Sequence, residues 1–288
     1  ATLRGGELER EFDAQWPRFA GEKLLRRRAN LAAIGRRLGD FSAPKMGTAR
    51  ALARRGASFE ARFGGDLARK LTGFDLVYAN CAISGEAFLQ LRQWPRNTQL
   101  VAHVHEMNWA LSQAGDGWKW LRERADFFVA ASHAVARELE ENQGIARQKI
   151  GVVHEFLDFS RLETDQNAAK SALRRDLGVP ESAFLVGGCG AAEWRKGLDW
   201  WAQVAASCGA QRTGQRRAGE VHFVWLGARD NAFLRGVKFD VAHWNIENRV
   251  HFLEPRADTR DFFAGLDAFA LSSREDPFPL VAIQAAAQ

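Results

Sequence analysis

The chain lacks any stretch that approaches the roughly 20 uncharged apolar residues needed for a membrane-spanning helix. Its N-terminus also lacks the succession of charged, apolar and small residues that marks a secretory signal. These two absences predict a cytoplasmic protein.

Cysteine is scarce, since Cys81, Cys189 and Cys208 are the only ones and no C-x-x-C pair occurs. This excludes a disulfide framework and a zinc knuckle, and it predicts reduced, mostly buried thiols. An internal repeat of solenoid period is also absent. Because no D-x-D pair stands in a context ready for a ligand, we expect chemistry that needs no divalent metal.

Positive charge is concentrated at the N-terminal end, where residues 1–70 hold 16 Lys and Arg against 8 Asp and Glu. The remaining residues hold 24 against 27. Apolar residues recur there at helical spacing from Leu24 to Leu38, which predicts short amphipathic helices. The basic clusters suit solvated helix faces or peripheral contact with an anionic membrane. Nucleic acid is not an expected partner, because the aromatic residues of this part form no base-stacking motif.

From residue 74 onward, short apolar runs alternate with helix-like segments, as in parallel sheets wrapped by helices. The length fits two such domains, and we place them at residues 1–160 and 161–288. A polar stretch, 158–180, is the predicted connection between them. Strands are expected at 74–78, 99–105, 126–131, 150–154, 184–187, 222–226, 250–253 and 267–271. Helices are expected at 134–141 (capped by Ser132), 197–208, 259–266 and from 279 onward.

A glycine-rich turn, predicted over 187–190, follows one of these strands, and Arg195-Lys196-Gly197 then opens a helix. Glycines at Gly188 and Gly190 let a backbone approach a phosphate, and the helix start and the two cations would stabilise its charge. Glu193 stands where a dinucleotide fingerprint needs its third glycine, which weakens an NAD interpretation. A plain strand-to-helix turn with two surface cations is the alternative.

The segment Ser272–Val281 runs from a strand end through prolines into a helix. Ligands of α/β proteins bind at the carboxyl ends of parallel strands, and carboxylates such as Glu275 and Asp276 suit a ligand rich in hydroxyl groups. In the alternative interpretation Asp276 caps the helix while Phe278 and Leu280 fill the core.

Histidines gather at the end of a strand in the first domain, where His103, His105 and Glu106 follow one another. A metal site would need further ligands at suitable spacing, and none is evident. Satisfied strand-end histidines are one alternative. His154 and Glu155 end another strand and are further candidates.

Taken together, these segments resemble the retaining glycosyltransferases of family 4, also called glycosyl transferases group 1, which have the GT-B fold. The resemblance runs from about Phe74 to the end of the chain, through eight runs in the family's order. They are FDLVYAN, VAHVHEMNW, ADFFVAASHAV, KIGVVHEFLD, GCGAAEWRKGLD, HFVWLGARD, RVHFLEP and FALSSREDPFPLVAIQAAA. The resemblance implies two Rossmann-like domains facing a cleft, an acceptor-side one and a nucleotide-sugar-binding one. It also implies a chain truncated at both ends, without the family's first strand and its last elements.

Family resemblance assigns the nucleotide-sugar contacts residue by residue. The phosphates would lie on Gly188 and Gly190, with Lys196 matching the family lysine. Ala191 replaces the usual arginine, so Arg195 would supply the second cation. The family's two glutamates correspond to Asp276, for the donor sugar, and Gln284, for the ribose, although Gln284 brings no charge. Further donor contacts fall on Glu275, Phe278, Pro279, Leu280 and Val281, and His105 matches a cleft histidine beside the transferred sugar.

The function implied is transfer of a sugar from a UDP- or GDP-linked donor to a saccharide or lipid-linked acceptor. The configuration would be retained, no cofactor would be needed, and cations and backbone N–H groups would stabilise the departing diphosphate. No covalent nucleophile is identified. The alternatives are a nucleotide-sugar 2-epimerase, a phosphorylase-like enzyme with a pyridoxal lysine, and a non-catalytic nucleotide-sugar-binding protein.

Overall fold

The computed structural model describes residues 71–89, 91, 94–159, 163–210 and 220–288. The predicted amphipathic helices and basic clusters of residues 1–70 lie outside this set. The chain divides into two compact units, with the second beginning at His154, and each is described by itself. Within the described ranges, no helix combines the length and the apolar character that crossing a bilayer demands.

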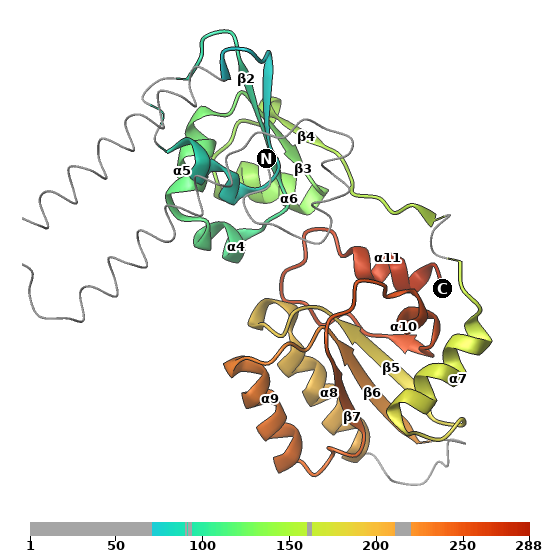
Figure 1. Cartoon of the computed structure of the whole chain (residues 1–288). Coiled ribbons are helices and arrows are strands. Elements are labelled where there is room, and N and C mark those ends of the chain that lie inside the picture. Colours follow the sequence, from blue (N-terminus) through green and yellow to red (C-terminus); the bar gives the residue numbers. More distant parts are fainter. Residues whose placement is uncertain (1–70, 90, 92–93, 160–162, 211–219) are drawn as a thin grey trace, which may run out of the picture. The chain divides into compact units, whose positions relative to one another are not determined.

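The first unit is built on a parallel sheet in the order β1-β2-β3-β4 (Figure 1). One face of this sheet packs into a core, which contains Leu100, Ala102 and Val104 of β2 and Phe128 of β3. The strands are β1 (Leu76–Ala79), β2 (Gln99–Val104), β3 (Phe127–Ala130) and β4 (Ile150–Val152). All four predicted strands of this unit are therefore present, and each was predicted one or two residues too long at an end.

Helices of the first unit include several that the sequence pattern did not predict. A Cβ on Gly85 would lie 1.9 Å from the backbone oxygen of Gly117, so these two glycines let their helices pack at backbone contact. Ser132 caps its helix as predicted, its side chain accepting a bond from the Val135 N–H at 3.2 Å. The helical segments are η1 (Ala82–Phe88), α4 (Asn108–Gln113), α5 (Gly115–Arg124), α6 (His133–Arg137), one π turn η2 (Glu138–Asn142) and η3 (Arg147–Lys149).

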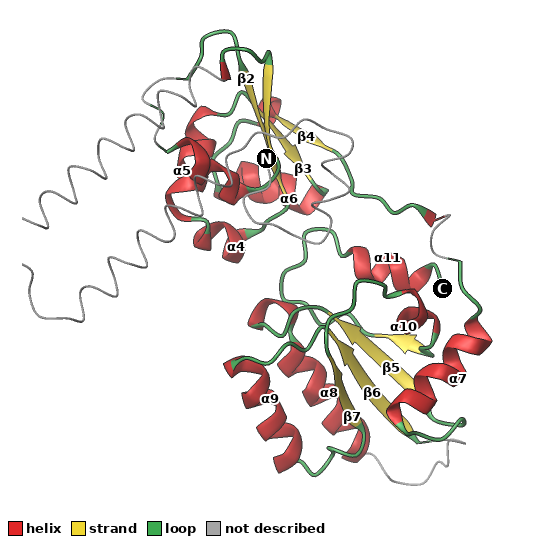
Figure 2. Ribbon diagram, viewed as in Figure 1, coloured by secondary structure: helices red, strands yellow, loops and turns green. Residues whose placement is uncertain are grey.

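The second unit has a parallel sheet in the order β7-β6-β5-β8 (Figure 2). Its core lies on both faces, with Trp201 and Trp225 on one side and Leu185 and Phe262 on the other. Helices α8 and α9 cover the first face and α7, α10 and α11 the second. The strands are β5 (Phe184–Cys189), β6 (Val221–Leu226), β7 (Val250–Leu253) and β8 (Ala268–Phe269). The helices are α7 (Gln166–Leu177), η5 (Trp194–Lys196), α8 (Leu198–Ala210), α9 (Ala232–His243), α10 (Arg260–Ala264) and α11 (Leu280–Ala286).

The prediction of two α/β domains with parallel sheets is confirmed, but the predicted connection 158–180 is wrong in part. Helix α7 occupies most of it, capped by Asp165, which accepts from the Ala168 N–H at 3.1 Å. The helix ends at Gly178 (φ 66°) and packs against α10. The polar residues on the exposed face of α7 made this segment look like a linker, although it is an amphipathic helix of the second unit.

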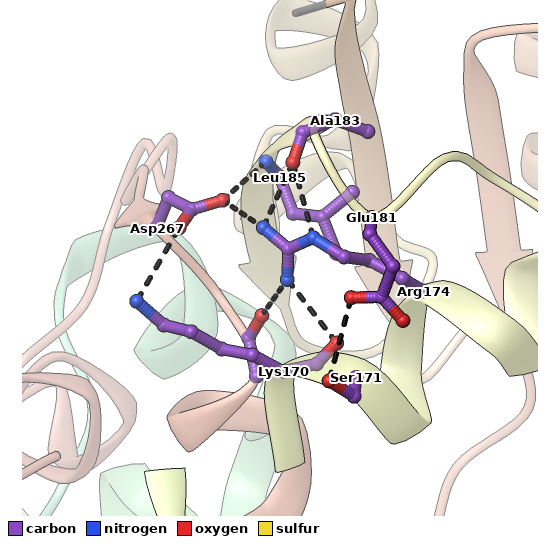
Figure 3. Close-up of polar contacts among 8 residues, drawn as sticks. Lys170, Ser171, Arg174, Glu181, Ala183, Leu185 and Asp267 are labelled. Carbon is purple, nitrogen blue, oxygen red and sulfur yellow. Dashed lines mark hydrogen bonds and ion pairs between the residues drawn. The ribbon is translucent and has the colours of Figure 1, made fainter. Parts of the chain in front are cut away.

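A buried arginine fastens α7 to the sheet (Figure 3). The Arg174 guanidinium donates to the carbonyls of Ala183, Lys170 and Gly265 at 2.8–3.2 Å and to Asp267 Oδ2 at 2.5 Å. Asp267 also accepts from the Leu185 N–H at 2.8 Å. This charge pair thus joins α7, β5 and the segment that enters β8.

Candidate functional site

Two segments of the second unit, singled out by the sequence as separate motifs, meet beyond the carboxyl end of β5. The first holds η5 and the start of α8, and the second is the loop that follows β8. A Cβ on Gly197, whose φ is 68°, would lie 2.0 Å from the Ser272 carbonyl oxygen. Only glycine allows both that backbone conformation and that approach. The Ser272 hydroxyl also donates to the Lys196 carbonyl at 3.2 Å.

Lys196 and Asp276 form an ion pair at the centre of this junction. The Lys196 Nζ lies 2.7 Å from Asp276 Oδ2, and the two side chains are 17% and 11% exposed. The Ser273 hydroxyl donates to the same carboxylate oxygen at 3.0 Å. The structure therefore brings together the predicted phosphate-binding lysine and the predicted sugar-binding carboxylate, and it holds them largely out of water. The Asp276 carboxylate serves this pair, and the alternative in which it caps α11 is wrong, because Pro279 is the N-cap and no side chain caps that helix.

Arg195 lies beside this pair and is held from two sides. It donates to Glu193 Oε1 at 2.9 Å and to the Glu275 carbonyl at 3.1 Å. Its side chain is 22% exposed. Two cations consequently stand next to each other at the end of β5, where an anionic group would meet charge-assisted donors.

Arg274 is a third cation of the junction and was missed by the sequence analysis. Its guanidinium makes a two-pronged pair with Asp199 of α8, with both N–O distances 2.8 Å. It also stacks on Trp200 and Trp194, with its central carbon 3.8 and 4.7 Å from the ring centroids. The sequence holds two hints of this contact. Arg274 is an arginine directly before two acidic residues, and Asp199 is a carboxylate about one helical turn after Arg195 and Lys196.

The turn was predicted over residues 187–190, but Gly187 and Gly188 belong to strand β5 and pack in the core. Gly188 lies inside β5, and a Cβ there would lie 2.4 Å from the Trp225 ring. The turn begins only at Gly190, whose N–H donates to the Leu226 carbonyl and whose carbonyl accepts from the Trp225 indole, each at 2.9 Å. A Cβ on Gly190 would press on the Lys196 side chain at 3.1 Å. Gly190 thus leaves space for the lysine stem, and Gly188 leaves space for Trp225.

The remaining predicted donor contacts lie at the start of α11. Phe278 stacks on His154 with ring centroids 5.4 Å apart, and Val281 packs against the core. Helix α11 begins at Leu280. Glu275 offers its backbone carbonyl to Arg195, and Gln284 lies half-buried on α11.

In the first unit, the predicted histidines meet at the end of β2. The rings of His103 and His105 have centroids 3.8 Å apart, and the Tyr78 hydroxyl lies 2.6 Å from His103 Nδ1. Glu106 accepts from the backbone N–H groups of Ala82 and His105 at 3.1 and 2.9 Å, so it braces a loop. In the parts of both units that the structure describes, no group of three or more His, Cys, Asp or Glu is placed to hold a metal ion.

The cysteines differ from one another in environment. Burial raises the pKa of the Cys189 thiol to about 11, although the nearby Lys196 opposes this rise. Cys81 and Cys189 are half-buried and Cys208 is exposed on α8, so the expectation of mostly buried thiols is wrong.

Comparisons with known proteins show which family the chain resembles. Residues 20–161 match the family model described as Glycosyltransferase Family 4, and residues 183–288 match the one described as Glycosyl transferases group 1. The chain is 30% identical over 240 residues to D-inositol 3-phosphate glycosyltransferase of Nocardia farcinica, a match that covers 76% of this chain and 51% of that relative.

Two solved structures show the same fold at low sequence identity. HepE of Anabaena, in complex with UDP and glucose, has a TM-score of 0.63 at 22% identity over 78% of this chain and 60% of its own. Sucrose-phosphate synthase of Thermosynechococcus elongatus has a TM-score of 0.57 at 21% identity over 74% of this chain and 54% of its own. The chain thus spans about half the length of the curated relative and three fifths of the HepE chain.

Proposed function

The chain belongs to the group 1, family 4 glycosyltransferases, and from this membership we propose that it transfers a sugar from a nucleotide-sugar donor to a hydroxyl of its acceptor. Its two α/β units have the GT-B fold. The observation that carries the proposal is the junction of Arg195, Lys196 and Asp276, where two cations and a carboxylate meet at the carboxyl end of β5.

The donor diphosphate is assigned to the cationic side of this junction. Lys196 and Arg195 offer charged donors to phosphate oxygens, and both already lie in fixed, largely buried positions, so little side-chain freedom is lost on binding. The N–H of Gly190 is engaged with Leu226, which leaves the cations as the main diphosphate contacts. Either UDP or GDP suits this arrangement, and no cofactor is needed.

Asp276 is assigned to the hydroxyl groups of the donor sugar. One of its oxygens already accepts from Lys196 and Ser273. A carboxylate has about four lone-pair sites, so further sites remain to accept from a sugar. Gln284 would bond the ribose through its amide, and His105 would donate to the transferred sugar.

Sugar transfer then proceeds through an oxocarbenium-like transition state. The anomeric C–O bond to the diphosphate breaks, the leaving oxygen gains negative charge, and Lys196 and Arg195 stabilise that charge in place of a metal ion. The acceptor hydroxyl attacks on the face from which the diphosphate leaves and gives its proton to the departing diphosphate oxygen, so the anomeric configuration is retained.

The acceptor is a saccharide, presented on a lipid at the cytoplasmic face of an anionic membrane. The charge excess of residues 1–70 supports this assignment, since each Lys or Arg near an anionic surface contributes about 1 kcal/mol. A non-catalytic nucleotide-sugar-binding protein is the rival function, and it would bind the donor without turning it over.

The test is calorimetric titration of UDP and GDP into this chain, in buffer containing EDTA. One of them is expected to bind despite the chelator, and Lys196→Ala should weaken binding by about 1.5–3 kcal/mol, the scale for hydrogen bonds to charged groups. Lys238→Ala, on α9 away from the junction, is the control and should bind normally. Unchanged affinity in Lys196→Ala would refute the diphosphate assignment, and binding only after added Mg²⁺ or Mn²⁺ would refute metal independence.

A further inference from the structure

We propose that Arg274 is a positioning residue that fastens the loop Ser272–Pro277 to α8 and η5, and thereby sets the distance between Asp276 and Lys196. The inference rests on the proposed function of this junction and adds a residue to it. Arg274 acts through its neighbours and makes no contact with the donor.

The Asp276 loop has little regular structure of its own to hold it. Between the end of β8 at Phe269 and the start of α11 at Leu280, no helix or strand occurs. The position of Asp276 therefore depends on the contacts that the loop makes with other segments, and not on a backbone ladder.

Arg274 supplies several of these contacts. Its guanidinium bonds both oxygens of Asp199 at 2.8 Å and the Trp194 carbonyl at 2.6 Å. A paired arginine and carboxylate in this geometry fix both the direction and the distance of the two chains. The same bonds lower the pKa of Asp199.

Two indole rings hold the guanidinium in place. Its central carbon lies 3.8 Å from the centroid of Trp200 and 4.7 Å from that of Trp194. The Arg274 side chain is only 11% exposed, whereas the rings are 49% and 46% exposed. Its charge is thus matched by both oxygens of Asp199 and its flat faces are covered by the indoles, so it is not available to a diphosphate.

The backbone of Arg274 and Glu275 hydrogen-bonds to Arg195, one of the cations of the site. The Arg274 N–H donates to the Arg195 carbonyl at 2.8 Å, and Arg195 donates back to the Glu275 carbonyl at 3.1 Å. Lys196 and Asp276 are the next residues along each segment and form the ion pair. Releasing Arg274 would therefore free both partners of the pair at once.

Lysine cannot reproduce this role. It has a single ammonium group, so it can pair with one oxygen of Asp199 but cannot make the two-pronged bond or stack its plane on an indole. Arg274→Lys keeps the positive charge but loses the two-pronged geometry, whereas Arg274→Gln loses both. Comparing the two variants therefore separates the effect of charge from that of geometry.

The experiment measures UDP and GDP affinity by calorimetry for the full chain and for Arg274→Gln, Arg274→Lys, Asp199→Asn and the Arg274→Gln/Asp199→Asn double variant. Arg274→Gln should weaken binding about tenfold, within the range of couplings inside one contact network. Arg274→Lys should recover only part of this loss, and the double variant should bind no worse than Arg274→Gln. The matched control is Arg235→Gln, which removes an exposed pair between Arg235 of α9 and Asp230 just before that helix and should leave affinity unchanged.

Amide hydrogen exchange of residues 272–276 provides a readout that needs no ligand. Exchange there should be faster in Arg274→Gln than in the unchanged chain, while the strands of the second unit exchange as before. If Arg274→Gln fails to fold, Arg274→Lys and Asp199→Asn carry the same test. Unchanged affinity together with unchanged exchange overturns the proposal. If the unchanged chain binds neither nucleotide, the proposed function fails, and exchange in the loop still decides the role of Arg274.

Discussion

Replacing Arg174 by methionine should destabilise the second unit severely, although the residue lies away from the candidate site. The Arg174 side chain is 5% exposed and its partner Asp267 is 18% exposed. Methionine keeps the apolar stem and the helix propensity of α7 but removes every donor. Any loss of stability in this variant can therefore be attributed to the polar contacts of Arg174 that Figure 3 shows.

The magnitude follows from what the substitution leaves behind. Breaking a buried ion pair by removing one partner costs about 3–5 kcal/mol, because the other charge remains uncompensated. Here Asp267 keeps the Leu185 N–H at 2.8 Å and Lys170 at 3.4 Å, which favours the lower end of this range. The carbonyls of Ala183 and Gly265 lose their donors at the same time. We expect a loss of about 3 kcal/mol, a large part of the 5–15 kcal/mol typical of a domain.

Urea unfolding followed by tryptophan fluorescence measures this loss, since Trp201 and Trp225 are buried in the second unit. With m-values of about 1–3 kcal/mol per molar urea, the midpoint should fall by about 1–3 M. Arg175→Met, at the next and exposed position of α7, is the control and should shift the midpoint little. A loss below about 1 kcal/mol in Arg174→Met would mean that water or Lys170 compensates for the lost guanidinium, and that the buried network contributes little to stability.

Two further predictions concern pH and lipid. Burial lowers the pKa of His222 and His251 from the ordinary value of 6.5, and His222 Nδ1 lies 3.1 Å from His251 Nε2. As the pH falls through about 6.5, these histidines take up protons in the unfolded chain before they do so in the folded one. The free energy of unfolding should therefore decline below that pH. Above about pH 6.5, the two histidines should not affect it. Urea midpoints at pH 7.5 and 5.5 test this, and His251→Gln should flatten the dependence; an equal slope in that variant would contradict it. The chain should also sediment with anionic but not neutral vesicles and be released by salt, because exposed charges are screened over about 10 Å at 0.1 M ionic strength. Equal recovery on both lipids would mean that the arginines of residues 1–70 only solvate helix faces.

The strands could be predicted from the sequence because buried parallel strands read as continuous apolar runs. The run His222–Leu226 is an example, and the strand there begins at Val221. Helix α9 escaped prediction, although Asn231 caps it by accepting from the Leu234 N–H at 2.9 Å. Its exposed Phe239 and scattered apolar residues blur the helical period. Helix α7 was missed as a whole, because its exposed polar residues look like those of a linker.

The candidate site could be predicted as two motifs but not as one junction. Gly190, Lys196 and Asp276 were identifiable from residue type and spacing. The ion pair between Lys196 and Asp276 was not, because no local pattern encodes a contact between residues 80 positions apart. Arg274 was overlooked for the same reason, since its role depends on Asp199, 75 positions earlier.

The long span of these contacts has a consequence for how the protein matures. Lys196 and Asp276 are 80 positions apart, so the junction cannot close until the chain through Asp276 has left the ribosome and β8 has paired with β5. A nucleotide that needs the closed junction then has no affinity for earlier folding intermediates. Such a nucleotide would stabilise only chains in which the junction has closed, in proportion to the logarithm of its concentration. The cellular level of the donor would thereby influence how long the newly made protein survives.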